Sequence, residues 1–110
     1  MLNKTHWLIQ RITAIILIPI TMWFFYTMLN FDDFAYSEIL LFFSSKINSS
    51  LFLFAILIMI YHGKLGVQII IEDYINSYTL QKKIVIFINL LSYILMIVSI
   101  LSILSIQLNN

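Results

Sequence analysis

The chain has 110 residues, of which 62% are hydrophobic and 10% are charged, with a net charge of +1 and a mean hydropathy of +1.01. A soluble domain of this size cannot hide so much apolar surface, so the bilayer must solvate most of the chain. The weak net charge argues against a nucleic-acid-binding surface. The absence of cysteine excludes disulfides, thiolate metal sites and iron–sulfur ligation.

Three apolar stretches dominate the chain, at about 7–29, 51–71 and 84–108. Each reaches the roughly 20 residues that a helix needs to cross the hydrocarbon core. Helix is the expected conformation, because a chain this short cannot close a barrel and must satisfy its backbone internally. The sequence therefore predicts an all-α membrane protein, a single domain over 1–110 with three transmembrane helices. Pro19 interrupts the first span, and we expect a kink there.

The two linkers differ in charge. The first, 30–50, is acidic and contains an apolar segment, 36–43, that we expect to lie along the membrane interface as a helical turn or two. The second, 72–83, ends in two lysines, and the N-terminus is also basic. Counting cations by the positive-inside rule predicts that the N-terminus and second linker lie in the cytoplasm or matrix. The C-terminus would then lie outside.

His62 lies near the middle of the second span, where a histidine is costly and usually functional. A neutral imidazole ligates metals and haem iron, and the structural alternative is an interhelical hydrogen bond or a proton relay. Gly66, one turn further on the same face, leaves room for a flat macrocycle or for close helix packing. His6 is about half a bilayer away and is a poor second ligand, so a sixth iron ligand would have to come from another chain.

Three polar residues are expected near the inner membrane surface. The hydroxyl of Tyr74 can donate a hydrogen bond to a quinone carbonyl, with Asp73 beside it, although an interfacial anchor tyrosine would look the same. Arg11, at the inner end of the first span, suits a haem propionate or a quinone headgroup, and equally suits snorkelling to the interface. Lys64 points away from His62, about 200° round the helix.

The third span carries a polar stripe of Asn89, Ser92 and Ser99 that is typical of a packing seam. No nucleophile triad, phosphate-binding loop or zinc spacing occurs along the sequence. We therefore expect the chain not to be an enzyme on its own.

Two motifs resemble a known family. Trp7-Leu8-Ile9-Gln10-Arg11-Ile12-Thr13-Ala14 resembles the W-x-x-Q-R-x-T-A opening of the hydrophobic D-type anchor of succinate dehydrogenase, the small cytochrome b subunit of respiratory complex II. The run from His62 through Gly66 to Asp73-Tyr74 resembles the family's H-x-x-x-G…D-Y signature. Three spans over nearly the whole chain also fit. The short N-terminus before Trp7 and the presence of Lys64 depart from the family pattern.

The resemblance implies a role for each matching residue. His62 would be one axial ligand of the iron of haem b, with the second from the C-type cytochrome b anchor. Arg11 would lie near a propionate and the quinone pocket, with Gly66 beside the haem. Tyr74 would donate to ubiquinone, with Asp73 next to it.

The resemblance also implies a setting in the cell. The three helices would form part of a larger haem-containing bundle in a mitochondrial or bacterial inner membrane. Electrons from succinate would arrive through a flavoprotein subunit and an iron–sulfur subunit. Other functions remain open at this point: an anchor of a quinol:fumarate reductase, a purely structural small subunit of another respiratory complex, and a pore-forming oligomer. The last would need a polar stripe along a whole helix, and the second span has only a patch.

Overall fold

A computed structural model describes residues 4–109, which form four helices. These are α1 (Lys4–Leu29), α2 (Tyr36–Ser44), α3 (Lys46–Tyr74) and α4 (Tyr78–Leu108). The three long helices, α1, α3 and α4, are each long and apolar enough to cross a membrane. The predicted all-α fold with three membrane spans is therefore confirmed, and the helix of α1 continues through Pro19.

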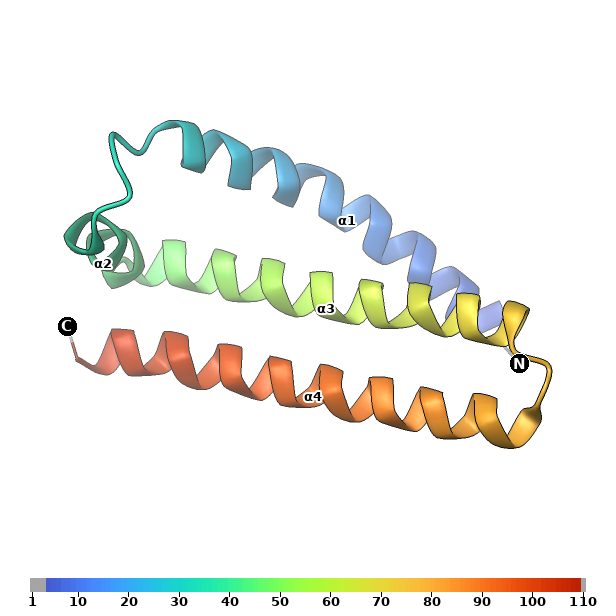
Figure 1. Cartoon of the computed structure of the whole chain (residues 1–110). Coiled ribbons are helices and arrows are strands. Elements are labelled where there is room, and N and C mark those ends of the chain that lie inside the picture. Colours follow the sequence, from blue (N-terminus) through green and yellow to red (C-terminus); the bar gives the residue numbers. More distant parts are fainter. Residues whose placement is uncertain (1–3, 110) are drawn as a thin grey trace.

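The three long helices run along one common direction, with α3 in the middle (Figure 1). Within the described residues α1 and α4 each pack against α3 and make no contact with each other. The molecule measures 50 × 26 × 22 Å, so its long axis matches a bilayer with its headgroup regions. The N-terminal end of α1 lies beside the α3–α4 turn, and the C-terminal end of α4 lies at the opposite end, near α2 (Figure 1).

Serine caps set where two of the spans begin. The Ser45 side chain accepts a hydrogen bond from the Asn48 backbone N–H at the start of α3, and Ser77 does the same for Leu80 at the start of α4. These caps satisfy backbone donors that the first helical turn leaves without partners. Both helices begin before the apolar runs, and α3 continues past its run to Tyr74, so the expected linker 72–83 shrinks to residues 75–77.

The acidic loop after α1 leads into the short helix α2, which confirms the helical turn expected over 36–43. Both carboxylate oxygens of Glu38 accept backbone hydrogen bonds, from Asp32 at 3.1 Å and from Asp33 at 3.3 Å. The Ala35 backbone N–H donates to the Asp33 carboxylate, and this bond, with the neighbouring Glu38 side chain, lowers the pKa of Asp33. The loop is thus held by its own carboxylates.

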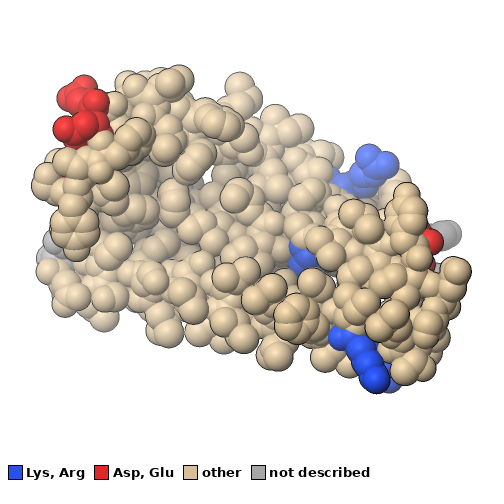
Figure 2. Space-filling view, in the orientation of Figure 1, with Lys and Arg blue, Asp and Glu red and all other residues tan. Residues whose placement is uncertain are grey.

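The chain has very little core of its own. Among the described residues only four apolar side chains are buried: Ala55, Leu65, Ile71 and Ile103. Most of the large apolar side chains lie on the outside, as expected when lipid or another membrane protein covers the helices. Figure 2 shows a broad, largely uncharged band, with one acidic cluster at the α1–α2 end and the visible basic side chains, together with a second acidic group, in the other half.

Of the predicted polar stripe on α4, Ser92 is buried where the helices pack. Near the C-terminal end of α4, beyond that stripe, the Gln107 amide donates to Ser49 Oγ of α3 at 2.9 Å and to the Phe43 carbonyl of α2. Ser99 instead donates to the Leu95 carbonyl of its own helix. Small residues at a helix interface allow close approach in a membrane, where packing rather than the hydrophobic effect drives association.

Candidate functional site

A hydrogen bond between two spans fixes the position of His62. His62 Nδ1 lies 2.9 Å from Thr13 Oγ1, so the imidazole of α3 faces α1. Thr13 is 5% exposed, and the histidine ring is only partly buried. The interhelical hydrogen bond considered as an alternative role for His62 therefore exists, and it uses one ring nitrogen only.

Gly66 lies where α1 comes close to α3. A Cβ built on Gly66 would sit 3.4 Å from the side-chain nitrogen of Gln10, while one built on Gly63 would meet nothing within 4 Å. The carbonyl oxygen of the Gln10 amide is buried and has no hydrogen-bond partner among the described residues. A methyl group at 66 would therefore just reach van der Waals contact with α1, and a larger side chain would enter the space between α1 and α3.

Gly66→Leu is expected to push α1 away from α3 and to weaken the Thr13–His62 contact. Overfilling a packed site costs about 1–3 kcal/mol, which a lower melting temperature of the purified assembly would report. Gly63→Leu is the matched control, because it gives the same gain in helix propensity with no neighbour to displace. Equal stability of the two variants would show that Gly66 is not tightly packed.

The residues around His62 suit a metal that brings most of its own ligands. Residues 5–109 of the structure contain no group of three or more His, Cys, Asp or Glu side chains able to hold a bare metal ion. A haem iron receives four ligands from its macrocycle and needs only axial ones from protein. His62 can supply one, because its second ring nitrogen, Nε2, has no hydrogen-bond partner among the described residues.

The register between α1 and α3 places Arg11 closer to the level of His62 than to that of Tyr74. Thr13 is opposite His62 and Gln10 is opposite Gly66, so Arg11 lies about level with residues 64–65. Tyr74 is then nine to ten residues further along, roughly 14 Å at the helical rise. The expectation that Arg11 and Tyr74 share one membrane level is wrong. The Arg11 guanidinium instead lies over the Trp7 ring, 5.4 Å from its centroid, on the exposed side of α1.

The other residues expected near a quinone lie at the C-terminal end of α3. Tyr74 ends the helix and is 81% exposed, and Asp73 is exposed as well. Glu72 is held more firmly, because its carboxylate accepts from Gln68 and its backbone carbonyl accepts from Gln81. Tyr74 and Asp73 are therefore available to another molecule.

Lys64 faces α4, on the side of α3 away from His62. Its ammonium lies 4.9 Å from the ring centroids of both Tyr61 and Tyr93, and donates a hydrogen bond to the Tyr93 hydroxyl at 3.3 Å. Two aromatic faces and a hydroxyl replace part of the water that this cation loses at membrane depth. The expected direction of Lys64 is confirmed, and its role in this structure is to join α3 to α4.

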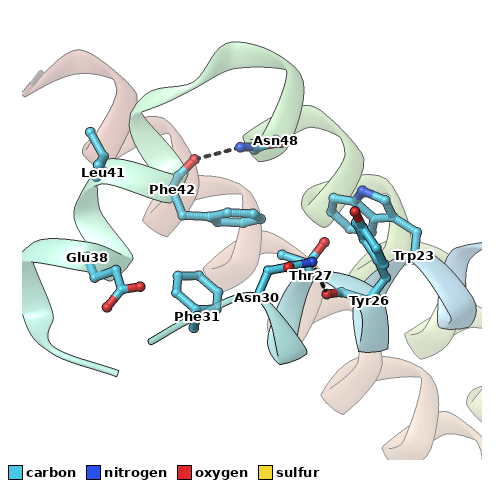
Figure 3. Close-up of a pocket in the computed structure, with 9 residues that line it drawn as sticks. All are labelled: Trp23, Tyr26, Thr27, Asn30, Phe31, Glu38, Leu41, Phe42 and Asn48. Carbon is cyan, nitrogen blue, oxygen red and sulfur yellow. Dashed lines mark hydrogen bonds between the residues drawn. The ribbon is translucent and has the colours of Figure 1, made fainter. Parts of the chain in front are cut away.

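A cavity of about 510 Å³ lies at the opposite end of the molecule, between α1, α2 and the start of α3 (Figure 3). Asn30 and Asn48 face it, and each donates to a nearby backbone carbonyl. Its lining combines aromatic, amide and carboxylate side chains: Trp23, Tyr26, Thr27, Asn30, Phe31, Glu38, Leu41, Phe42 and Asn48. None of the residues predicted for a haem or a quinone lines it, and its composition is typical of an aromatic interfacial belt.

Sequence reasoning did not assign a role to Thr13, Gln10 or Tyr93. The first two lie three residues apart and so share one face of the first span, which was a signal that this face of α1 meets something polar. Nothing in the sequence links Tyr93 to Lys64, because the pair is formed across two helices.

Comparison with known proteins agrees with the arrangement of spans and motifs. Residues 2–104 match the family model described as succinate dehydrogenase/fumarate reductase transmembrane subunit. The chain is similar to proteins named succinate dehydrogenase hydrophobic membrane anchor subunit in three Rickettsia species. The one from Rickettsia bellii is 35% identical over 89% of this chain and 78% of the relative. Those from Rickettsia prowazekii and Rickettsia conorii are 34% and 35% identical, each over 77% of this chain and 68% of the relative.

No solved structure shows significant similarity to the chain. The family match nevertheless covers nearly all of it, including α1, α3, most of α4 and both motifs that carry the resemblance. This chain belongs to the family of succinate dehydrogenase/fumarate reductase transmembrane subunits.

Proposed function

We propose that this chain is the hydrophobic membrane anchor of a succinate:quinone oxidoreductase, in which it supplies one axial ligand to haem b and part of the quinone site. The observation that carries the proposal is the mid-span imidazole of His62, which is fixed through Nδ1 and leaves Nε2 available. The names of the three Rickettsia relatives favour succinate dehydrogenase over fumarate reductase. The chain is a non-catalytic subunit in this proposal.

The residues near His62 would hold the haem by complementary means. His62 Nε2 would coordinate the iron, and the Arg11 guanidinium, carried by α1 at about the level of residues 64–65 of α3, would neutralise a propionate. A haem b bound here would supply a one-electron carrier within the membrane. A second axial ligand would come from a C-type cytochrome b anchor, since His6 lies seven residues before Thr13, roughly 10 Å further along α1.

The quinone site would form at the inner end of α3. The Tyr74 hydroxyl would donate a hydrogen bond to a ubiquinone carbonyl, and Asp73, which only accepts when ionised, would orient the neighbouring groups. A quinone needs a dry, largely apolar pocket, whereas both side chains are exposed in this chain. The remaining walls would therefore be built by the partner anchor and the iron–sulfur subunit, which receives electrons from the flavoprotein subunit.

The test of this function is the reduced-minus-oxidised absorption spectrum of the complex purified through a tag on this chain. We expect b-type haem bands, together with co-purified flavoprotein, iron–sulfur and second anchor subunits. Expression of this chain without its partners should yield no haem-loaded protein, because three helices in a row cannot enclose a macrocycle. A complex that contains these subunits but shows no b-type bands would contradict haem ligation.

The proposed orientation places the N-terminus and the α3–α4 turn in the cytoplasm or matrix of an inner membrane. Because the chain has no cysteine, single cysteines can report each side. In sealed right-side-out vesicles, Ser37→Cys in α2 should react with a membrane-impermeant maleimide, and Asn76→Cys in the turn should react only after permeabilisation. Labelling of denatured protein gives the total for each variant. The opposite pattern would reverse the topology.

A further inference from the structure

The hydroxyl of the buried residue Thr13 lies against His62, and three atoms are within hydrogen-bond distance of it. Its Oγ1 lies 2.9 Å from the Ile9 carbonyl oxygen and 3.0 Å from the Gln10 carbonyl oxygen, both in its own helix. It also lies 2.9 Å from His62 Nδ1 on α3. Three partners thus surround the hydroxyl of a residue that is 5% exposed.

The single hydroxyl proton determines which partner donates. Carbonyl oxygens only accept, so the proton of Thr13 is shared between the two carbonyls of α1. When the proton is placed in this way, the hydroxyl oxygen is left with lone pairs, and His62 Nδ1 is the donor to it. With the Thr13 proton on the α1 carbonyls, the neutral imidazole carries its proton on Nδ1 and the lone pair lies on Nε2.

We propose that Thr13 is the positioning residue that sets the tautomer and ring orientation of His62 for ligation of iron through Nε2. This inference rests on the proposed haem function. An outer hydrogen bond to the second nitrogen of a ligating histidine commonly fixes its tautomer and ring plane. Here the acceptor is a neutral hydroxyl rather than a carboxylate, and it is itself anchored by α1.

The experiment compares Thr13→Val with wild type in the assembled complex. Valine keeps the branched shape and removes the hydroxyl, so the helices can still pack while the ring loses its acceptor. We expect shifted g values of the low-spin ferric haem in electron paramagnetic resonance and a higher midpoint potential, because the imidazole becomes a weaker donor. Haem affinity should fall roughly 10–100-fold, the usual loss for an outer partner of a ligand.

Three further variants make the result decisive. Thr13→Ser should keep the wild-type g values and potential, because it restores the hydroxyl. Thr21→Val, the same change at an exposed position of α1, should also leave them unchanged. If Thr13→Val fails to assemble, Thr13→Ala removes the hydroxyl without adding bulk and should show the same spectral shift.

Wild-type g values, potential and haem affinity in Thr13→Val, or in Thr13→Ala, would overturn the positioning role. The proposed function would survive that result if His62→Ala still lost the axial ligand. Conversely, an unchanged bis-histidine signal in His62→Ala would remove the proposed haem function and this inference with it. The two failures are thus distinguishable.

Discussion

His62→Ala is expected to abolish bis-histidine ligation of the haem in the assembled complex. Nε2 is the only ring nitrogen of His62 without a partner among the described residues, so it is the atom available to the iron. Alanine removes it. Haem affinity should fall by more than the roughly 10–100-fold that loss of an outer partner costs. Electron paramagnetic resonance of the oxidised complex reads the axial ligands directly, and haem content is measured on the same sample.

His6→Ala is the matched control, since it removes the other imidazole of the chain from near the start of α1. It should keep the wild-type bis-histidine signal. A normal signal in His62→Ala with a lost signal in His6→Ala would exchange the two assignments. The residual absorption spectrum distinguishes lost haem from haem held by a substitute ligand.

Tyr74→Phe is expected to slow quinone reduction while haem content and assembly remain intact. The variant removes one hydroxyl from an exposed side chain at the end of α3, so the fold loses no packing. A quinone carbonyl left without its donor costs about 1–3 kcal/mol, which corresponds to about a 5- to 150-fold loss in kcat/KM for quinone. Steady-state quinone kinetics on the purified complex measures it.

Tyr78→Phe provides the comparison, because Tyr78 is a similarly exposed interfacial tyrosine at the start of α4. It should retain wild-type kinetics. If Tyr74→Phe also keeps the wild-type rate and quinone affinity, Tyr74 is an interfacial anchor and the quinone assignment is wrong. If both variants lose quinone activity, the cause is a general effect of interfacial tyrosines at the membrane surface rather than one hydrogen bond from Tyr74.

The spans were predictable because each satisfies a simple length and composition rule. The ends of α3 and α4 were not, since an apolar run measures how far a helix crosses hydrocarbon, whereas a helix can continue into the interface with polar residues. Ser77, which caps α4 only three residues after Tyr74, shows how short the true connection is. Hydropathy alone therefore predicted a second linker, 72–83, that is longer than the observed connection, 75–77.

The site was predictable one helix at a time. Helical spacing placed Lys64 away from His62, and the structure agrees. Relative register was not available from one sequence, so the Thr13 contact was missed and Arg11 was placed too close to the level of Tyr74. Charge counting assigns a residue to a side of the membrane, but it gives no depth.

The aromatic pair around Lys64 has a consequence for how the chain enters the bilayer. A lysine near the centre of a lone helix raises the free energy of insertion by about 2.5–3.5 kcal/mol. Tyr61 shares the helix of Lys64, but Tyr93 arrives only with α4, which follows after residues 75–77. We therefore expect α3 and α4 to insert together as a helical hairpin, with the cation already sheltered between them. When α1 then packs against α3 in that hairpin, Thr13 reaches His62 and fixes the orientation of its ring.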